Sequence, residues 1–205
     1  MTPRNTNGNS GKNPKDTAAA TTEDMPPADL YIDRMSASQA LAAMLANQAH
    51  AITALEAALP AIDAAADAAY QRLSTSDNGR LIYVGAGTSA RIGVQDGAEL
   101  PPTFNWPHHR IGFVIAGGEA ALLRAVENAE DSAETACMHI ADMGVAQNDV
   151  VIGLAASGST VFTTAALVAA GQAGAVTIGV ANNPDTALLE SVSYPILLAT
   201  GAEII

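Results

Sequence analysis

The chain has 205 residues, of which 49% are hydrophobic and 4% aromatic, so it can form one domain with a core of Ala, Val, Leu and Ile. Nine basic residues against 21 acidic ones give a net charge of −12. This balance argues against nucleic acid and anionic membrane surfaces as partners. An anionic ligand must therefore be attracted by local dipoles and donors.

Residues 1–28 are rich in small polar residues and Pro, and we expect them to form a disordered tail. They contain no apolar core of a signal peptide. No uninterrupted run of about 18 apolar residues follows, so the sequence predicts a cytoplasmic protein without a membrane span. Cys137 is the only cysteine, which excludes an internal disulfide. We expect it to be a buried structural thiol in a helix.

Residues 29–76 predict a helical hairpin. Ser36 and Gln39 have the spacing of a capping box, and apolar residues then recur at helical spacing up to Pro60. A second, Ala-rich helix follows and ends before residues 77–79, Asp-Asn-Gly. The hairpin exposes an Ala/Leu face that one small domain does not cover, so we expect a homodimer.

Residues 77–205 predict an α/β domain, and we expect the hairpin to pack beside it or against a partner. Continuous apolar runs alternate with helical stretches, which is typical of a parallel sheet with helices on both faces. The runs are Leu81–Val84, Ile111–Ala116, Val150–Ala155, Val176–Ala181 and Ile196–Ala199. The expected fold is a three-layer sandwich with a five-stranded parallel sheet. The right-handed crossover rule then places every strand-to-helix loop at one edge of the sheet.

Two loops at this edge share a chemistry. Residues 85–89, Gly-Ala-Gly-Thr-Ser, and residues 156–160, Ala-Ser-Gly-Ser-Thr, each join a strand to a helix N-terminus. Glycines admit a ligand to the backbone, and free N–H groups with the helix dipole favour an anion. The candidate binding residues are Gly87, Thr88, Ser89, Ser157, Gly158, Ser159 and Thr160.

Three interpretations of these loops remain open. They can be ordinary turns and N-caps, for which Ser, Thr and Gly are common. They can belong to a dinucleotide-binding fold, since Gly85, Gly87 and Ala90 match a glycine-rich fingerprint. The acidic residue of that fold would fall near Asn105, however, and Glu119 comes late. The third interpretation, a sugar-phosphate site, suits two matched loops best. A Walker loop is excluded because no Gly-Lys-Ser/Thr follows.

Two carboxylates are candidates for acid–base chemistry. Glu99 precedes a proline pair, Pro101 and Pro102, which we expect to terminate the helix and hold the carboxylate in place. Glu130 belongs to a second acidic cluster at residues 127–131. Neighbouring carboxylates can divide acid and base roles when their environments separate their pKa values. A solvated acidic surface is the alternative. No cluster has metal-ligand spacing, so we expect neither a metal nor a cofactor.

Residues 79–104, GRLIYVGAGTSARIGVQDGAELPPTF, closely resemble the signature of the N-acetylmuramic acid 6-phosphate etherases. This family belongs to the sugar isomerase (SIS) domain superfamily, together with the glucokinase regulatory protein. Further blocks resemble the family in the same order: YIDRMS, IAGGEAALLRAVENAED, DVVIGLAASGST and TIGVANNPDTAL. The resemblance extends from Tyr31 to Ile205.

The resemblance implies a carbon–oxygen lyase of cell-wall amino-sugar recycling. Its substrate is a muramic acid 6-phosphate, and its products are N-acetylglucosamine 6-phosphate and D-lactate. The family's acid maps to Glu99 and its base to Glu130. Two other functions remain: a non-catalytic sugar-phosphate-binding regulator with the same loops, and a dinucleotide-dependent oxidoreductase, which would need NAD binding.

The chain departs from the family pattern at several positions. The family usually has Gly where this chain has Ala90, and Ala where it has Gly97. It usually has Arg-Thr-Pro at positions 159–161 and Cys-Asn-Pro at positions 182–184, where this chain has Ser-Thr-Val and Asn-Asn-Pro. These changes bear on affinity and specificity. Family members also continue beyond Ile205, so the resemblance implies that the 77–205 domain is truncated and lacks its last flanking helix. Either the sequence is a fragment, or the protein is a shortened relative of the family.

Overall fold

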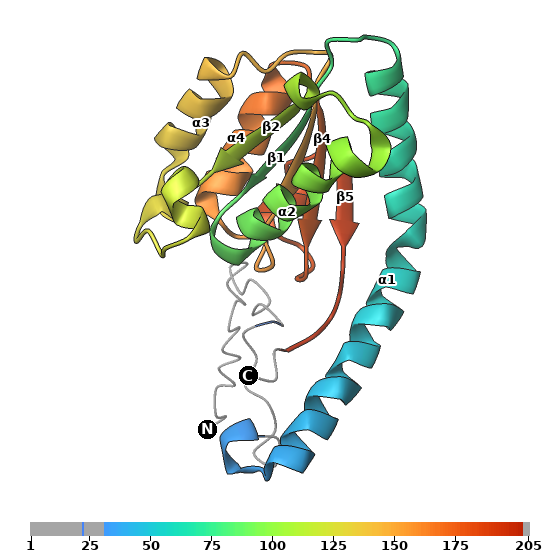
Figure 1. Ribbon diagram of the computed structural model, residues 1–205, viewed down its shortest axis with the longest axis vertical. Helices are drawn as coiled ribbons and strands as arrows, with labels where there is room; N and C mark the ends of the chain where they lie inside the picture. The colour runs from blue at the N-terminus through green and yellow to red at the C-terminus, as the bar shows by residue number, and fades with distance from the viewer. Residues whose placement is uncertain (1–21, 23–30, 203–205) are drawn as a thin grey trace, which may run out of the picture.

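The structure, a computed structural model, describes Thr22 and residues 31–202. Apart from Thr22, the tail expected over residues 1–28 lies outside the described residues. One long helix precedes a domain in which strands and helices alternate (Figure 1). No helix within the described part of the chain combines the length and hydrophobicity needed to cross a bilayer.

A five-stranded parallel sheet forms the middle layer. Its strands are β1 (Leu81–Gly85), β2 (Ile111–Ile115), β3 (Val150–Leu154), β4 (Val176–Ala181) and β5 (Tyr194–Leu197). Their order across the sheet is β2-β1-β3-β4-β5, and every neighbouring pair is parallel. The α/β class predicted from the apolar runs is confirmed. The fifth strand begins two residues earlier than expected because Tyr194 and Pro195 also pair with β4, and an edge strand tolerates proline.

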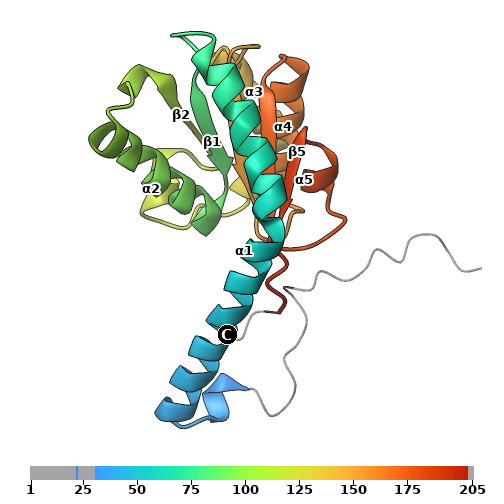
Figure 2. The ribbon, with the colours of Figure 1, turned by 90° about the vertical axis from the view of Figure 1, so that its right-hand side faces the viewer.

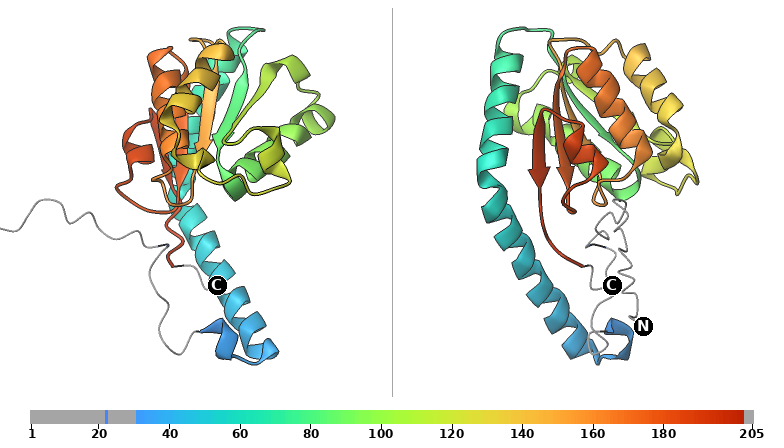
Figure 3. Two further views of the ribbon diagram at one scale, coloured as in Figure 1. Left: turned by 90° about the vertical axis from the view of Figure 1, so that its left-hand side faces the viewer. Right: turned by 180° about the vertical axis from the view of Figure 1, so that it is seen from behind.

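Helices cover both faces of the sheet, which gives the expected three layers (Figures 2 and 3). The helices α1 (Ala37–Ser74) and α2 (Gly87–Phe104) pack on one face, and α3 (Ala133–Asp142), α4 (Val161–Gln172) and α5 (Ala187–Glu190) on the other. Four short 3-10 turns complete the described chain: η2 (Ile32–Arg34), η3 (His108–Arg110), η4 (Glu119–Leu122) and η5 (Ala129–Asp131). The apolar strands are therefore buried between two helical layers.

The expected hairpin over residues 29–76 is wrong, because α1 is one continuous helix of 38 residues. The capping box of Ser36 and Gln39 is present, as predicted. Pro60 lies inside the helix, where it leaves the carbonyl of Glu56 without its usual donor. Both residues are exposed, so water can satisfy that carbonyl, and Ala-rich flanks keep the helix intact. The N-terminal half of α1 extends beyond the carboxyl ends of β4 and β5 (Figure 1).

Two further local expectations are corrected. The pair Pro101 and Pro102 does not end α2, which continues to Phe104. Asn105 ends it instead, with a left-handed φ of 53° and its backbone N–H donated to the carbonyl of Leu100. Cys137 lies in a helix as predicted, but it is not buried as expected. The buried face of α3 is the one that carries Ala136 and Ile140, and Cys137 lies outside that face.

The carboxyl ends of all five strands meet at one edge of the sheet, as the crossover rule predicted. The chain leaves β1 toward α2 on one face and leaves β3 toward α4 on the other. Because β1 and β3 are neighbours, their loops diverge at a topological switch point. Ligands of open α/β sheets bind at such points.

Candidate functional site

The loop after β1 places the N-terminus of α2 at the carboxyl edge. Gly87 starts the helix with a φ of 53°, and Ala86 before it provides no side-chain cap. The N–H groups of the first turn therefore remain available to a ligand. Gly85 is needed for close packing, since a Cβ there would lie 3.0 Å from the backbone of Ala90. Gly85 thus permits close packing within the fold, and Gly87 begins the helix whose first N–H groups are available as donors.

A cavity of about 240 Å³ opens beside this helix N-terminus. One side is formed by the loop after β1 and the first turns of α2. The opposite side is formed by residues 124–130, which we call the 124–130 wall. The lining residues are Ala86, Gly87, Thr88, Arg91, Ala116, Ala121, Arg124, Ala125, Val126, Glu127, Asn128, Ala129 and Glu130. The cavity therefore brings three predicted site residues together: Gly87, Thr88 and Glu130.

The 124–130 wall is held in place by the turn after β2. Gly117 has a φ of 78°, and a Cβ on it would lie 2.8 Å from the Cβ of Val126. Only glycine permits both the turn and this close approach. Asn128 adopts the left-handed conformation with a φ of 59°, which Asn tolerates better than most residues. Local backbone geometry thus positions Glu130 across the cavity from α2.

Arg91 joins the two sides of the cavity. Its Nε donates to the carbonyl of Leu122 and its Nη2 to the carbonyl of Ala121, both at 3.0 Å, while Nη1 lies 3.5 Å from Oγ1 of Thr88. The two carbonyls belong to η4, directly before the 124–130 wall. Arg91 therefore fixes the width of the cavity, and its cationic group also adds positive charge beside the helix N-terminus.

The loop after β3 forms a tight turn at the same edge. Gly158 has a φ of 70° and packs so closely on Thr186 that a Cβ would collide with it. Ser157 accepts hydrogen bonds from the N–H of Ser159, at 3.2 Å, and from its hydroxyl, at 3.0 Å. The buried Asn183 donates to the carbonyl of Ser157 at 3.1 Å. The loop is thus fixed by its own serines and by the loop after β4.

The remaining predicted residues lie outside the cavity lining. Residues 157–160 belong to the turn just described. Ser89 lines a separate apolar groove of about 260 Å³, together with Ile92, Leu154, Ala155, Ala156, Val180, Asn182 and Leu198. Glu99 is exposed on α2, twelve residues after Gly87, which is about 18 Å along a helix axis. Within one chain, Glu99 and Glu130 are therefore not brought together.

The geometry offers little to a dinucleotide. Asn105, at the position of the expected acidic residue, is the cap of α2. Glu119 is exposed in η4 and lines a different surface, beside β2 and α3. Neither residue lines the cavity at the N-terminus of α2. Within the described ranges, no three His, Cys, Asp or Glu side chains gather in a way that could hold a metal ion.

Arg91 and Arg124 are site residues that the sequence analysis missed. A signal for them existed, because the whole chain has only nine Lys and Arg residues. Arg91 follows the glycine-rich loop by one helical turn, and Arg124 precedes the acidic cluster. What could not be foreseen is that the two segments face each other across one cavity.

Comparison with known proteins places this geometry in context. The model of the glucokinase regulatory protein N-terminal SIS domain matches residues 65–171. The N-acetylmuramic acid 6-phosphate etherase of Deinococcus radiodurans is 44% identical over 184 residues, which is 90% of this chain and 60% of that protein. The etherase of Pasteurella multocida is 40% identical over 187 residues, 91% of this chain and 62% of that protein. The chain thus spans about 60% of the length of these curated relatives.

Among solved structures, a phosphoheptose isomerase from Francisella tularensis is similar with a TM-score of 0.62. The match covers 80% of this chain and 85% of that chain, at 20% sequence identity. At this identity the likeness concerns the fold alone. It agrees with the parallel sheet and flanking helices described above.

Proposed function

Because this chain belongs to the family of the glucokinase regulatory protein N-terminal SIS domain, we propose that it binds a sugar phosphate at the carboxyl edge of its sheet. We propose further that it acts as an N-acetylmuramic acid 6-phosphate etherase, a carbon–oxygen lyase. The strongest support is the shared cavity of Gly87, Thr88 and Glu130, in a chain 44% identical to a protein of that name. It combines anion donors with a carboxylate.

The proposed reaction needs one base and one acid. In the ring-opened sugar, the C2 proton lies α to an aldehyde and can be removed by the carboxylate of Glu130. An acid protonates the ether oxygen of the lactyl group as the C3–O bond breaks, which leaves a C2–C3 double bond and releases D-lactate. Water then adds at C3 to give N-acetylglucosamine 6-phosphate. General acid–base catalysis of this kind contributes about 10²–10⁴-fold.

Glu99 is the proposed acid, and it reaches the substrate from a second copy of the chain. It does not line the cavity of its own chain and lies on the exposed side of α2. Both α1 and α2 pack on the same face of the sheet. A contact between two copies through this face brings α2 of the partner toward the cavity. Glu99 of the partner subunit then complements Glu130.

The exposed apolar residues of α1 support a homodimer. Leu41, Leu45, Ile52, Leu55 and Leu59 are 48 to 75% exposed and define the exposed stripe of α1. They recur at steps of three, four and seven residues, the repeat of helices that pack along a seam. Between Ala37 and Leu59, Glu56 is the only Asp, Glu, Lys or Arg. Such an uncharged seam is complementary to a second copy of itself.

The proposal includes a cytoplasmic location and a role in recycling of peptidoglycan amino sugars. A sugar 6-phosphate carries a charged ester that does not cross a bilayer unaided. Its turnover therefore belongs in the compartment where the phosphate was added. Fractionation of cells followed by detection of the chain tests the location.

Release of D-lactate from N-acetylmuramic acid 6-phosphate tests the function directly, with solvent-deuterium exchange at C2 as a second readout. Glu130→Gln cannot accept the C2 proton and should lose both signals. Glu99→Gln should lose lactate release but keep C2 exchange, because abstraction precedes cleavage. Glu127→Gln, on the same wall, is the matched control and should keep both.

The outcomes separate the candidate functions. Saturable sugar-phosphate binding without lactate release or C2 exchange would identify a non-catalytic regulator instead. Retention of both signals in Glu99→Gln and Glu130→Gln would show that the two glutamates are solvated surface groups. A mixture of these two variants should regain roughly a quarter of the parent activity if the dimer supplies the acid, since mixed dimers contain one intact site.

A further inference from the structure

Arg124 differs from every other arginine in the described chain. Five of the six arginines between residues 31 and 202 are engaged. Arg34 stacks on Tyr31, Arg72 donates to two carbonyls, Arg80 pairs with Asp149, Arg91 donates to η4, and Arg110 donates to three carbonyls and stacks on Trp106. Within the same range the side chain of Arg124 has no hydrogen bond, ion pair or ring contact.

The position of Arg124 is nevertheless defined. Its backbone N–H donates to the carbonyl of Ala120 at 3.1 Å, so η4 holds the start of the 124–130 wall. Arg124 lines the same cavity as Thr88 and Glu130. A guanidinium without a partner, beside a cavity in a chain of net charge −12, is a site for an anionic group. Arginine binds carboxylates and phosphates through two parallel N–H donors.

The chemistry of the proposed substrate decides which anion this is. N-acetylmuramic acid 6-phosphate carries a phosphate on C6 and a carboxylate on the lactyl ether at C3. Glu130 acts at C2, the carbon next to C3, so the lactyl group must lie near the 124–130 wall. The phosphate lies at the other end of the sugar chain. The N-terminus of α2, with neutral N–H donors and Thr88, suits that phosphate.

From this arrangement we propose that Arg124 binds the lactyl carboxylate and makes the cavity selective for sugar phosphates that carry it. The inference rests on the proposed function and adds a specificity residue to it. Arg124 forms a pair of hydrogen bonds to the carboxylate and thereby holds the ether oxygen over the wall. N-acetylglucosamine 6-phosphate, which lacks the lactyl group, makes no use of Arg124.

Titration calorimetry with two ligands tests the proposal. N-acetylmuramic acid 6-phosphate and N-acetylglucosamine 6-phosphate differ only in the lactyl group. All titrations use a Glu130→Gln parent so that the ligand is not consumed. Arg124→Gln should weaken binding of the lactyl-bearing ligand roughly ten- to hundredfold, as expected for hydrogen bonds to a charged group. Binding of the second ligand should stay within about threefold, within the usual scatter of surface substitutions.

Arg124→Lys keeps the charge without the two-pronged geometry, so its loss should be intermediate. Arg34→Gln removes another exposed arginine and should leave both affinities unchanged, which controls for net charge. Equal losses for both ligands, or no loss for either, would overturn the assignment of Arg124 while leaving sugar-phosphate binding intact. If the parent binds neither ligand, the proposed function fails and the carboxylate site fails with it.

Discussion

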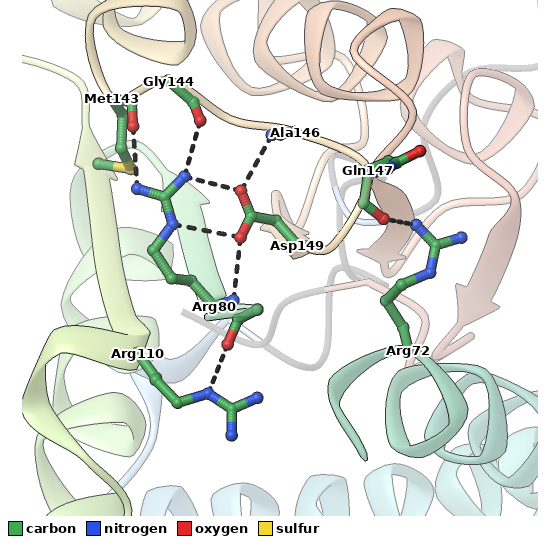
Figure 4. Close-up of polar contacts among 9 residues, drawn as sticks. Arg72, Arg80, Arg110, Met143, Gly144, Ala146, Gln147 and Asp149 are labelled. Atoms are coloured by element: carbon green, nitrogen blue, oxygen red, sulfur yellow. Dashed lines mark hydrogen bonds and ion pairs between the residues drawn. The ribbon is translucent and has the colours of Figure 1, made fainter. Parts of the chain in front are cut away.

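Asp149 and Arg80 form a two-pronged ion pair at the amino end of the sheet, opposite the candidate site (Figure 4). Nε of Arg80 donates to Oδ1 at 3.2 Å and Nη2 to Oδ2 at 2.7 Å. The guanidinium also donates to the carbonyls of Met143 and Gly144, and the carboxylate accepts from the N–H of Ala146 at 3.0 Å. The residues before β1 and before β3 are thereby joined.

Removing the carboxylate should destabilise the fold. Asp149 is 2% exposed. Asp149→Asn leaves the guanidinium of Arg80 and two backbone donors, the N–H groups of Arg80 and Ala146, without their charged acceptor. We expect a loss of about 3 kcal/mol in the free energy of unfolding, in the range for breaking a buried pair. Urea unfolding measures it. Asp142→Asn, at the C-terminus of α3, is the control, and equal stability of the two variants would contradict the role of the pair.

The same pair predicts a dependence of stability on pH. Burial alone would raise the pKa of Asp149, but hydrogen bonds from Arg80 and Ala146 and the charge of Arg80 together lower the pKa below its usual value. A lowered folded-state pKa contributes stability above the unfolded value of about 4, and this contribution disappears as the pH falls through the folded pKa. The stability difference between wild type and Asp149→Asn should therefore shrink in acid. A constant difference from neutral pH down to about pH 3 would contradict the linkage.

The 124–130 wall should depend on Gly117. In Gly117→Ala the new methyl group strains a φ of 78° and meets Val126, so the wall must shift from its present position. We expect sugar-phosphate affinity to fall at least tenfold, because small displacements of binding groups are costly. Gly144→Ala is the matched control, since Gly144 also has a positive φ but open space around it. Equal affinities of the two variants would show that the wall does not contribute to binding.

The phosphate should bind at the N-terminus of α2. Thr88→Val keeps the shape of the side chain but removes its hydroxyl, and we expect affinity for N-acetylglucosamine 6-phosphate to fall by about 1–2 kcal/mol. Thr103→Val, near the other end of α2, serves as the control. A similar loss in a bulky Ser157 variant would show that the loop after β3 shares the ligand. Unchanged affinity in Thr88→Val would exclude its hydroxyl from the phosphate site.

The exposed stripe of α1 should control assembly. Ile52 and Leu55 lie one turn apart on it and are 63% and 48% exposed. Ile52→Glu with Leu55→Glu places like charges in the proposed seam, so the chain should become monomeric at micromolar concentration. Light scattering measures the mass, and circular dichroism checks the helix content. A monomeric wild type, or a dimer unaffected by both glutamates, would rule out this interface.

Local patterns along the chain were enough to predict the layered domain. The apolar runs around Ile82, Val114 and Val151 are continuous because both faces of their strands are covered, and this periodicity is a property of the strand itself. The capping box of Ser36 and the glycine-rich turn before Thr88 are local as well. Each of these features depends on residues within a few positions of one another, so the sequence alone was enough to predict them.

Relationships between distant segments could be found only in the folded chain. Pro60 normally interrupts a helix, yet α1 continues because the carbonyl it leaves unpaired is exposed to water. Glu99 and Glu130 are both candidates for acid–base chemistry in the sequence, but their spacing does not show whether they meet. In the folded chain Glu99 lies about 18 Å from Gly87 along the axis of α2, away from the cavity. Arg91 and Arg124 line the same cavity because the turn at Gly117, with its positive φ, places the 124–130 wall opposite α2. These outcomes depend on solvent exposure and on the direction of each segment in space, which residue spacing does not encode.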